Sequence, residues 1–206
     1  MKPIPPAFYA RPTLEVAREL LGCEIWVKLG RSELGGRIVE TEAYIGEEDP
    51  ACHAHRGRTA RTSIMYGPAG FAYVYFTYGN HWMLNFVTER EEFPAAVLIR
   101  AIEPIVGTAL MRRRRRVPRD FDLTNGPGKL TSALGISGDE NGESLQGPRL
   151  KVISPPRKFD EPVATSGRIG VNEGFDRPWR FFLEGNPWVS KYRATPYARA
   201  AYSKAS

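Results

Sequence analysis

Short stretches of alternating or continuously apolar residues recur along the chain and predict a protein built mainly from strands. Residues 23–29 alternate between apolar and polar side chains, and residues 35–46 follow a similar pattern between glycines. Residues 95–104 form a mainly apolar run, which is typical of a buried strand. Two further strands are predicted late in the sequence, within residues 149–156 and 179–190.

Three segments have helical features. In residues 12–22 a proline suited to the first turn precedes an apolar stripe, and a glycine follows it. Residues 103–111 are predicted to be helical up to a run of five arginines, and residues 123–136 to form a turn leading into a helix. Because strands dominate and several are joined by short links, the pattern favours an α+β domain around a largely antiparallel sheet.

Residues 71–86 (FAYVYFTYGNHWMLNF) combine seven aromatic side chains with a Gly-Asn pair. Gly79-Asn80 is a favourable two-residue hairpin turn, because glycine adopts positive φ without steric cost. Such a turn places Tyr75 opposite Leu84 on the returning strand. The segment is therefore predicted to be a β-hairpin.

The two faces of this hairpin carry different tyrosines. Phe71, Tyr73 and Tyr75 share one face, whereas Tyr78 lies on the other face at the tip. Rings at this density are compatible with a packed core and with stacking on nucleic-acid bases. Tyr78 is either a wedge that enters a base stack in DNA or part of a tip that folds back onto the domain.

Two carboxylates and an aromatic ring share one row of the strand predicted at residues 35–46. Alternate side chains of a strand lie on the same face, and here that face carries Ile38, Glu40, Glu42 and Tyr44. Two interpretations are open. The face is exposed to solvent, or it places an acid or base beside a ring on which a ligand stacks.

The chain is basic, with a net charge of +6 at pH 7 and 22 arginines against 7 lysines. Arginine binds phosphate through a planar fork of N–H donors, so this bias favours contact with a polyanion, although a generally arginine-rich composition would also produce it. The candidate phosphate contacts are Arg56, Arg58, Arg61 and Lys129. The run from Arg112 to Arg116 is either a solvated segment or a further phosphate contact.

Cys52, His53 and His55 are close enough in sequence to suggest a metal site, but no second group of ligands follows them. We therefore expect no metal, and the absence of a Walker motif or dinucleotide fingerprint gives no reason to expect a cofactor. The sequence has two cysteines and no long apolar run at its start, which predicts a soluble protein without a disulfide framework or membrane span. The expected location is the cytoplasm, or the nucleoid in a bacterium.

Five blocks of the sequence resemble, in order and at similar spacing, the alkyladenine DNA glycosylase family, the mammalian-type 3-methyladenine DNA glycosylases. The blocks are RIVETEAY, YVYFTYGNHWMLN, VLIRAIEP, GPGKL and GNPWVS. The resemblance implies one compact α+β domain over residues 1–206, with a curved, largely antiparallel sheet flanked by helices and a protruding hairpin that inserts into DNA. The segments before about residue 8 and after about residue 192 are expected to be flexible tails.

The resemblance also implies roles for residues in the matching blocks. Glu42 corresponds to the general base, Arg100 to a residue that helps to hold the attacking water, and Tyr78 to the intercalating wedge. The implied base pocket contains Tyr44, His53, Tyr75, Asn85 and Leu98, with Asn85 meeting the purine edge. The sequence departs from the family in a slightly shorter loop between His53 and Gly70, and in Asn80 and His81 after the wedge.

These features predict a monofunctional DNA glycosylase that flips alkylated or deaminated purines out of double-stranded DNA and hydrolyses the N-glycosidic bond. It is expected to act as a monomer in base excision repair. No lysine falls within the pocket blocks, so water is the expected nucleophile and no lyase activity is expected. The alternatives are a non-catalytic basic nucleic-acid-binding module and a hydrolase of free nucleosides, although the basic charge and the exposed Tyr78 argue against the latter.

Overall fold

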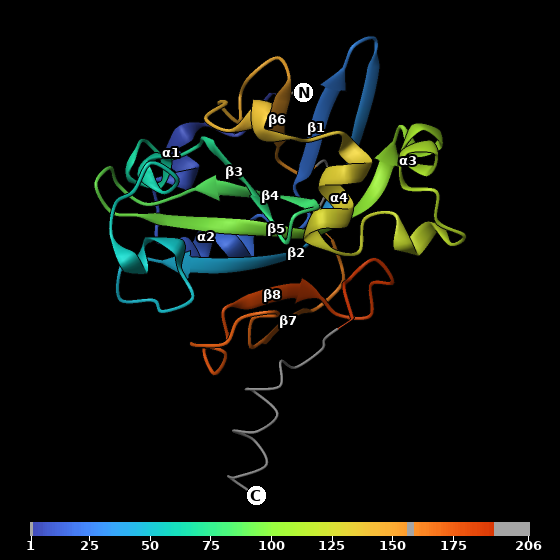
Figure 1. The fold of residues 1–206 in the computed structure, drawn as a ribbon. Helices are drawn as coiled ribbons and strands as arrows, with labels where there is room; N and C mark the ends of the chain where they lie inside the picture. The colour runs from blue at the N-terminus through green and yellow to red at the C-terminus, as the bar shows by residue number, and fades with distance from the viewer. Residues whose placement is uncertain (1, 156–158, 192–206) are drawn as a thin grey trace, which may run out of the picture.

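The chain folds around one sheet with the order β3-β4-β5-β2-β1-β6, in which β8 lies beside β2 and β7 beside β8 (Figure 1). The computed structural model describes residues 2–155 and 159–191. The strands are β1 (Glu24–Leu29), β2 (Ser32–Ile45), β3 (Ala72–Thr77), β4 (His81–Val87), β5 (Ala95–Val106), β6 (Leu150–Ile153), β7 (Val163–Ser166) and β8 (Arg180–Leu183). These described strands pair antiparallel.

β2 connects the parts of the sheet because its 14 residues pair with three other strands. β5 runs along one side of it, whereas β1 pairs with its first half and β8 with residues 40–42 of its second half. Register shifts interrupt the pairing of β2 with β5 between Gly35 and Gly36 and on both sides of Glu40. Such irregularities bend a strand and increase its twist, so the sheet curls into an open half-barrel.

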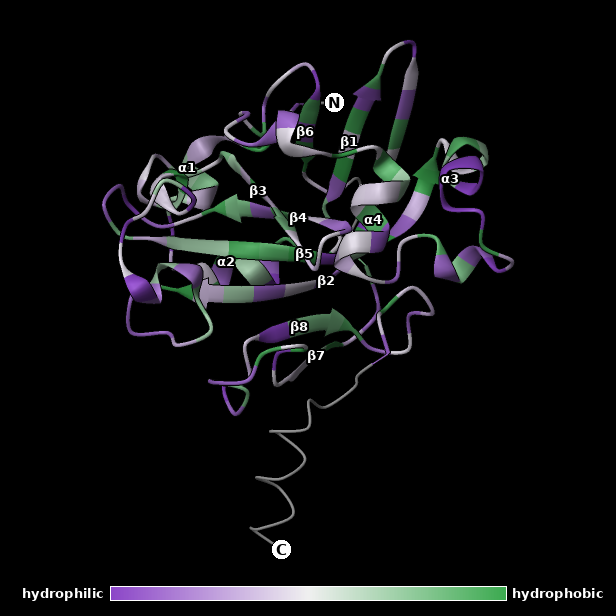
Figure 2. Ribbon diagram, viewed as in Figure 1, coloured by the Kyte–Doolittle hydropathy of each residue, from purple (hydrophilic) through white to green (hydrophobic). Residues whose placement is uncertain are grey.

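Short helices cover the sheet. The α-helices are α1 (Pro6–Tyr9), α2 (Thr13–Glu19), α3 (Thr108–Arg115) and α4 (Pro127–Leu134), and the 3-10 helices are η1 (His53–Arg56), η2 (Ser63–Tyr66), η3 (Asp120–Asp122) and η4 (Gly138–Glu140). α2 packs on the central strands, where Val16 and Leu20 are buried and the Thr41 hydroxyl donates to the Ala17 carbonyl at 2.8 Å. Much of β5 is hydrophobic, whereas the outer loops are mostly hydrophilic (Figure 2).

The main elements predicted from the sequence are confirmed. α2 lies within residues 12–22, and β1 and β2 match the two predicted early strands. β5, β6 and β8 lie at the other predicted strand positions, and α4 follows the predicted turn. The α+β class with a curved, antiparallel sheet is therefore confirmed.

The predicted helix over residues 103–111 is wrong in its first part. β5 continues to Val106, and α3 begins at Thr108 and includes four of the five arginines. Gly107 allows this abrupt change, because its φ is +78° and a Cβ there would lie 2.8 Å from the Glu33 carbonyl oxygen. The sequence pattern also does not predict β7.

The predicted hairpin is confirmed, but its predicted register is wrong. β3 and β4 pair so that Tyr75 lies opposite Met83 instead of Leu84. The loop holds three residues instead of two, because both Tyr78 and Gly79 adopt positive φ, of 52° and 70°. Positive φ is uncommon for a tyrosine, so rules based on Gly-Asn turns do not anticipate a turn that begins there.

The strand face that carries Glu40 and Glu42 is buried, so its interpretation as a solvent-exposed face is wrong. Both glutamates have 0% exposed surface. The predicted row also does not begin at Ile38, because the register shifts at Val39 and both of these residues lie in the main hydrophobic core. A bulge therefore separates the core part of β2 from the part that carries the carboxylates.

The N-terminal segment is attached to β6. The Ile4 N–H donates to the Val152 carbonyl at 2.9 Å, Pro3 forms a bridge with Ile153, and the Ile4 side chain is buried. These contacts argue against a free tail before residue 8, whereas the tail predicted after about residue 192 lies outside the described residues. Within the described ranges, no helix is long and apolar enough to cross a membrane.

Candidate active site

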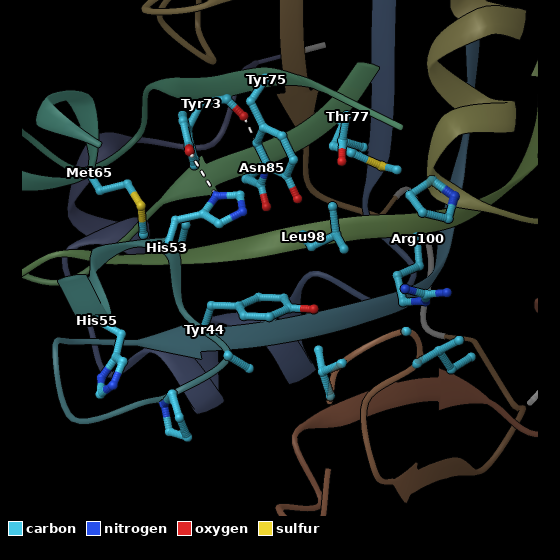
Figure 3. Close-up of a pocket in the computed structure, with 18 of the residues that line it drawn as sticks. Tyr44, His53, His55, Met65, Tyr73, Tyr75, Thr77, Asn85, Leu98 and Arg100 are labelled. Carbon is cyan, nitrogen blue, oxygen red and sulfur yellow. Dashed lines mark hydrogen bonds between the residues drawn. The ribbon is translucent and has the colours of Figure 1, made fainter. Parts of the chain in front are cut away.

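A cavity of about 720 Å³ opens beside the β3–β4 hairpin (Figure 3). The central strands contribute Tyr44, Leu98 and Arg100 to its lining, and the hairpin contributes Tyr75 on β3 and residues of β4. The loops on the remaining sides are the one around η1 and residues 169–173. This volume is in the range of small-molecule sites and accommodates a purine base.

The side chain of Glu42 is buried beside this cavity and accepts three hydrogen bonds. Its Oε2 accepts from the Tyr44 hydroxyl at 2.8 Å and from Arg100 Nη1 at 3.1 Å, and its Oε1 accepts from the Ile169 N–H at 2.7 Å. A carboxylate offers about four lone-pair positions, so these contacts within the described residues leave one position on Oε1 unused. Glu42 is therefore a buried acceptor that can still accept one further hydrogen bond.

Glu40 lies on the same strand but has a different environment. Its carboxylate accepts from Arg100 Nε at 3.0 Å, from Arg180 Nε at 2.6 Å, and from the N–H and hydroxyl of Ser190 at 2.8 and 2.7 Å. Burial raises the pKa of Glu40, but the charges of Arg100 and Arg180 and the Ser190 hydrogen bonds outweigh burial and lower it. Three of these donors reach Oε1 and one reaches Oε2, so the carboxylate of Glu40 is used mainly to hold Arg100, Arg180 and Ser190 in place.

Aromatic rings on three segments face the cavity (Figure 3). The centroids of the His53 and Tyr75 rings lie 4.5 Å apart with an interplanar angle of 74°. The centroids of the Tyr73 and Tyr75 rings lie 5.3 Å apart. Tyr44 is turned so that its hydroxyl donates to Glu42. Burial and the charge of Glu42 raise the pKa of Tyr44 well above its ordinary value, so this hydroxyl remains a donor. The structure thus brings together the three ring residues implied by the resemblance.

His53 is neutral at physiological pH. Although the residue borders the open cavity, the surrounding protein and, to a smaller extent, the charge of Arg61 lower the pKa of His53 to about 4. Its Nδ1 lies 2.9 Å from the Tyr73 hydroxyl, which fixes the orientation of the imidazole. The cavity therefore presents an uncharged imidazole next to tyrosine rings.

Asn85 and Leu98 lie opposite each other on β4 and β5 and both line the cavity. The Asn85 amide nitrogen donates to the Tyr73 carbonyl oxygen at 3.0 Å, which fixes the orientation of the carboxamide. Leu98 also pairs with Glu42 of β2, so it lies between the amide and the buried carboxylate. A purine in this cavity would meet a polar amide on one side and an aliphatic surface on another.

Tyr78 lies at the hairpin tip with 78% of its surface exposed, so the tip does not fold back onto the domain. It also belongs to the rim of the cavity. The large ring of Tyr78 has few packing contacts. Packing therefore does not explain why it stands at the tip of the hairpin, next to an aromatic cavity. The structure is therefore compatible with Tyr78 entering a base stack.

The predicted phosphate contacts of the η1 loop have different surroundings. Arg56 borders the cavity. Arg58 forms an ion pair with Glu92 at 2.9 Å, whereas the Arg61 guanidinium lies 4.8 Å from the centroid of the Tyr75 ring. Arg56 is thus placed at the rim, Arg58 is paired within the chain, and Arg61 packs against a cavity residue.

The remaining basic candidates lie around α3 and α4. Lys129 donates to Asn125 at 2.7 Å, close to the cavity rim formed by Pro127. Arg112 forms an ion pair with an aspartate of η3 at 2.5 Å, and Arg114 and Arg115 donate to backbone carbonyls at 2.9 and 3.2 Å. Three of the five consecutive arginines are therefore attached to the fold, so the run is not a freely solvated segment.

The sequence analysis missed the residues that complete the site from the C-terminal part of the chain. The Ile169 N–H is the third donor to Glu42, and Arg180 and Ser190 hold Glu40. Their partners lie more than 120 residues earlier in the sequence, so no local pattern points to them. Among the residues that the structure describes, no group of three or more His, Cys, Asp or Glu side chains could hold a metal ion.

The residues around the cavity supply the chemical groups that an enzyme needs to hydrolyse a bond to a planar aromatic leaving group. A buried carboxylate with one unused lone-pair position lies beside a cavity lined by rings, and a fixed arginine contacts the carboxylate and lines the cavity. The curled sheet holds these groups on rigid strands, while loops complete the cavity. This combination defines the class as an enzyme that cleaves a bond to an aromatic base.

Comparison with known proteins gives the family. Residues 7–187 match the methylpurine-DNA glycosylase family. A protein of Methanoculleus marisnigri named "Putative 3-methyladenine DNA glycosylase" is 47% identical over 91% of this chain and 98% of its own length. Proteins of the same name from Chlorobaculum parvum and Salinibacter ruber are each 46% identical, over 94% and 92% of this chain and 93% and 97% of their own lengths.

The chain therefore belongs to the methylpurine-DNA glycosylase family and is a DNA glycosylase, a hydrolase of N-glycosyl bonds. The family and the reaction class predicted from the sequence are confirmed. Membership in this family also argues against the alternatives of a non-catalytic binding module and of a hydrolase acting on free nucleosides.

Proposed function

We propose that this protein flips alkylated or deaminated purines out of double-stranded DNA and releases them by hydrolysis, with Glu42 as the general base. The observation that supports this proposal most directly is the environment of Glu42, a buried carboxylate with three fixed donors and one free acceptor position beside the ring-lined cavity. Candidate substrates are 3-methyladenine, 7-methylguanine, hypoxanthine and ethenoadenine.

In the proposed reaction, a water donates one hydrogen bond to Glu42 Oε1 and attacks C1′ of the flipped nucleotide. The C1′–N bond breaks and its electron pair leaves with the purine, while the water proton passes to Glu42. The negative charge of Glu42 also stabilises the positive charge that develops on the sugar. Arg100 holds Glu42 and itself borders the cavity, so it keeps the base and the water in position. The products are a free base and an abasic site.

The cavity suits a base that carries a positive charge. Alkylation at a ring nitrogen makes a purine cationic, and the faces of tyrosine rings attract cations. Tyr44 and Tyr75 supply such rings, and the low pKa of His53 keeps the neighbouring imidazole uncharged. A neutral His53 avoids the repulsion that an imidazolium would exert on a cationic substrate.

DNA binding is assigned to the hairpin and the basic residues around the cavity. We assign Tyr78 as the wedge that fills the space left by the flipped nucleotide, because it is exposed at the tip and borders the same cavity. Arg56 and Lys129 are the preferred phosphate contacts, whereas Arg58 and Arg61 would first have to leave Glu92 and Tyr75. The protein is proposed to act as a monomer on chromosomal DNA in the cytoplasm.

The experiment is incubation of the full chain with duplexes that each carry one hypoxanthine or one 7-methylguanine, followed by alkali to cleave abasic sites. Strand cleavage that depends on both the lesion and the alkali supports a monofunctional glycosylase. Cleavage without alkali would contradict the absence of lyase activity. Binding to the lesion duplex with no base release from any of the candidate lesions would contradict the proposed function.

A further inference from the structure

We propose that Arg168 is a positioning residue for the reaction, because it fixes both the ring of Tyr44 and the loop whose Ile169 N–H donates to Glu42. The inference rests on the function proposed above and adds a residue to the reaction that no sequence motif marks. Arg168 follows β7 and lies far along the chain from both Glu42 and Tyr44.

The side chain of Arg168 is buried and paired with Asp49. Both side chains have 0% exposed surface, and two parallel contacts join Nη1 to Oδ2 at 2.6 Å and Nη2 to Oδ1 at 2.8 Å. Asp49 also accepts from the backbone N–H groups of Ile45 and Ala51, both at 3.2 Å. A buried guanidinium is tolerated when it is paired in this way, and its planar fork restricts it to one orientation.

The same guanidinium contacts the strand beneath Tyr44. Nη1 donates to the carbonyl oxygen of Ala43 at 3.0 Å, and the centre of the group lies 4.8 Å from the centroid of the Tyr44 ring. The ring is therefore held at one point by Arg168 and at its hydroxyl by Glu42. Tyr44 is the ring on which we place the flipped purine, so Arg168 supports a surface that contacts substrate.

Arg168 also holds the loop that completes the cavity. Nη2 donates to the Gly174 carbonyl at 3.1 Å, so one side chain connects the two ends of the segment from 168 to 174. Residues 169–173 of this segment line the cavity, and the Ile169 N–H donates to Glu42 Oε1 at 2.7 Å. The oxygen that we assign to receive the water proton is thus oriented by the peptide group directly after Arg168.

One feature of the Arg168 side chain is not explained by packing alone. Arg168 Nε is buried and has no hydrogen-bond partner among the described residues. An unpaired buried donor is costly, so the side chain is not oriented solely to satisfy its own donors. Its orientation instead satisfies the contacts with Asp49, Tyr44 and the loop at the same time.

Loss of Arg168 should misplace Glu42 without removing it. Glu42 is faced by Arg100 from β5, by the Tyr44 hydroxyl from its own strand, by Tyr75 from β3, and by the Ile169 N–H and the charge of Arg168 from the loop. If the loop moves, Glu42 loses its one backbone donor, so base release should slow while binding of the lesion is kept.

The test uses the full chain and a duplex with one hypoxanthine in single-turnover assays. Arg168→Gln should release the base about 10- to 100-fold more slowly, as expected for a misplaced catalytic group, with lesion binding largely retained. The loss should appear in the single-turnover rate and not in the dissociation constant of the lesion duplex. Arg168→Lys, which retains the charge but not the planar fork, should be intermediate.

A second variant and a matched control separate an effect on the reaction from an effect on folding. Arg168→Gln leaves Asp49 buried without its partner, so the double variant Arg168→Gln/Asp49→Asn removes both charges and should fold more readily while remaining slow. The control is Arg177→Gln, because Arg177 also approaches Asp49, at 3.7 Å, but makes no contact with Tyr44 or Ile169 among those found. This control should keep the wild-type rate.

A folded Arg168→Gln variant or a folded double variant that releases the base at the wild-type rate would overturn the proposal. A slower rate that is fully explained by a smaller folded fraction, measured by near-ultraviolet circular dichroism, would overturn it as well. If the wild-type protein releases none of the candidate bases, the proposed function has failed instead, so the two failures are distinguishable.

Discussion

Replacement of Glu42 by glutamine is the most direct test of the proposed chemistry, and the structure shows that it is not a silent isosteric change. All three partners of the carboxylate found in the structure are hydrogen-bond donors. Glutamine offers one oxygen and one NH₂ group. If the NH₂ replaces Oε1, it faces the Ile169 N–H, and if it replaces Oε2, it faces both Arg100 and the Tyr44 hydroxyl.

The less costly orientation leaves one buried donor without an acceptor. Such a loss costs about 1–3 kcal/mol of unfolding free energy. Arg100 keeps its contact with Glu40, so its charge remains paired. A domain with a typical stability of about 5–15 kcal/mol stays folded after this change, so a loss of activity can be attributed to the chemistry.

The expected rate loss is larger than the stability loss. Removing a general base slows base release about 10²- to 10⁴-fold, which corresponds to about 3–5 kcal/mol of activation free energy. The assay is single-turnover release of hypoxanthine, combined with fluorescence anisotropy to show that the lesion duplex still binds. A matched control is Glu103→Gln on β5, which removes a partly exposed carboxylate paired with Arg37 and should keep the wild-type rate.

Base release by folded Glu42→Gln within about threefold of the wild-type rate would refute the assignment, since general bases contribute far more than that. Glu40 would not be an acceptable substitute for the role. Its carboxylate already accepts from Arg100, Arg180 and both donor groups of Ser190. Glu173, which also lines the cavity, would then be the next carboxylate to test.

Three further predictions concern the rim, the specificity and the pH dependence. Tyr78→Ala should slow excision from duplex DNA much more than from a single strand, where little unstacking is needed, and equal losses would contradict the wedge. Asn85→Ala should raise the release of undamaged guanine relative to hypoxanthine, because its NH₂ can oppose the 2-amino group of guanine at a cost of about 1–3 kcal/mol. An unchanged ratio of single-turnover rates would exclude this role. His53, whose folded pKa of about 4 lies below the ordinary value of 6.5, should contribute stability that is present above pH 6.5 and is lost as pH falls towards 4. His53→Gln should flatten the pH dependence of denaturant stability in that window, and an NMR titration of His53 with a midpoint near 6.5 would contradict the assignment.

Matched variants separate these effects from general damage. Phe76 is another exposed ring on the same hairpin, so Phe76→Ala should leave the ratio of duplex to single-strand rates unchanged. For Asn85, thermal unfolding of the variant reports the loss of its hydrogen bond to the Tyr73 carbonyl separately from the change in base preference.

The sequence by itself determined the main strands, the hairpin and the family. Alternation of apolar and polar residues is a local property, so β1, β2 and β5 are recognisable without knowledge of their neighbours. Glu42, Tyr44 and Tyr75 lie in blocks that resemble one family, and the structure places both tyrosines in the lining of one cavity and bonds Tyr44 to Glu42. The function of an acceptor carboxylate beside aromatic rings could therefore be anticipated from the order of residues along the chain.

Only the tertiary structure decided the environment of the carboxylates. The positive φ of Tyr78 moves the hairpin register by one residue, and the bulge at Val39 separates the core part of β2 from the part that carries Glu40 and Glu42. Both depend on how strands pair, which no single segment specifies. The donors that distinguish Glu42 from Glu40 come from Ile169 and from β8 and the residues after it, more than 120 residues away in sequence. Sequence periodicity carries no information about such distant pairs, because the closure of the chain around the core creates them.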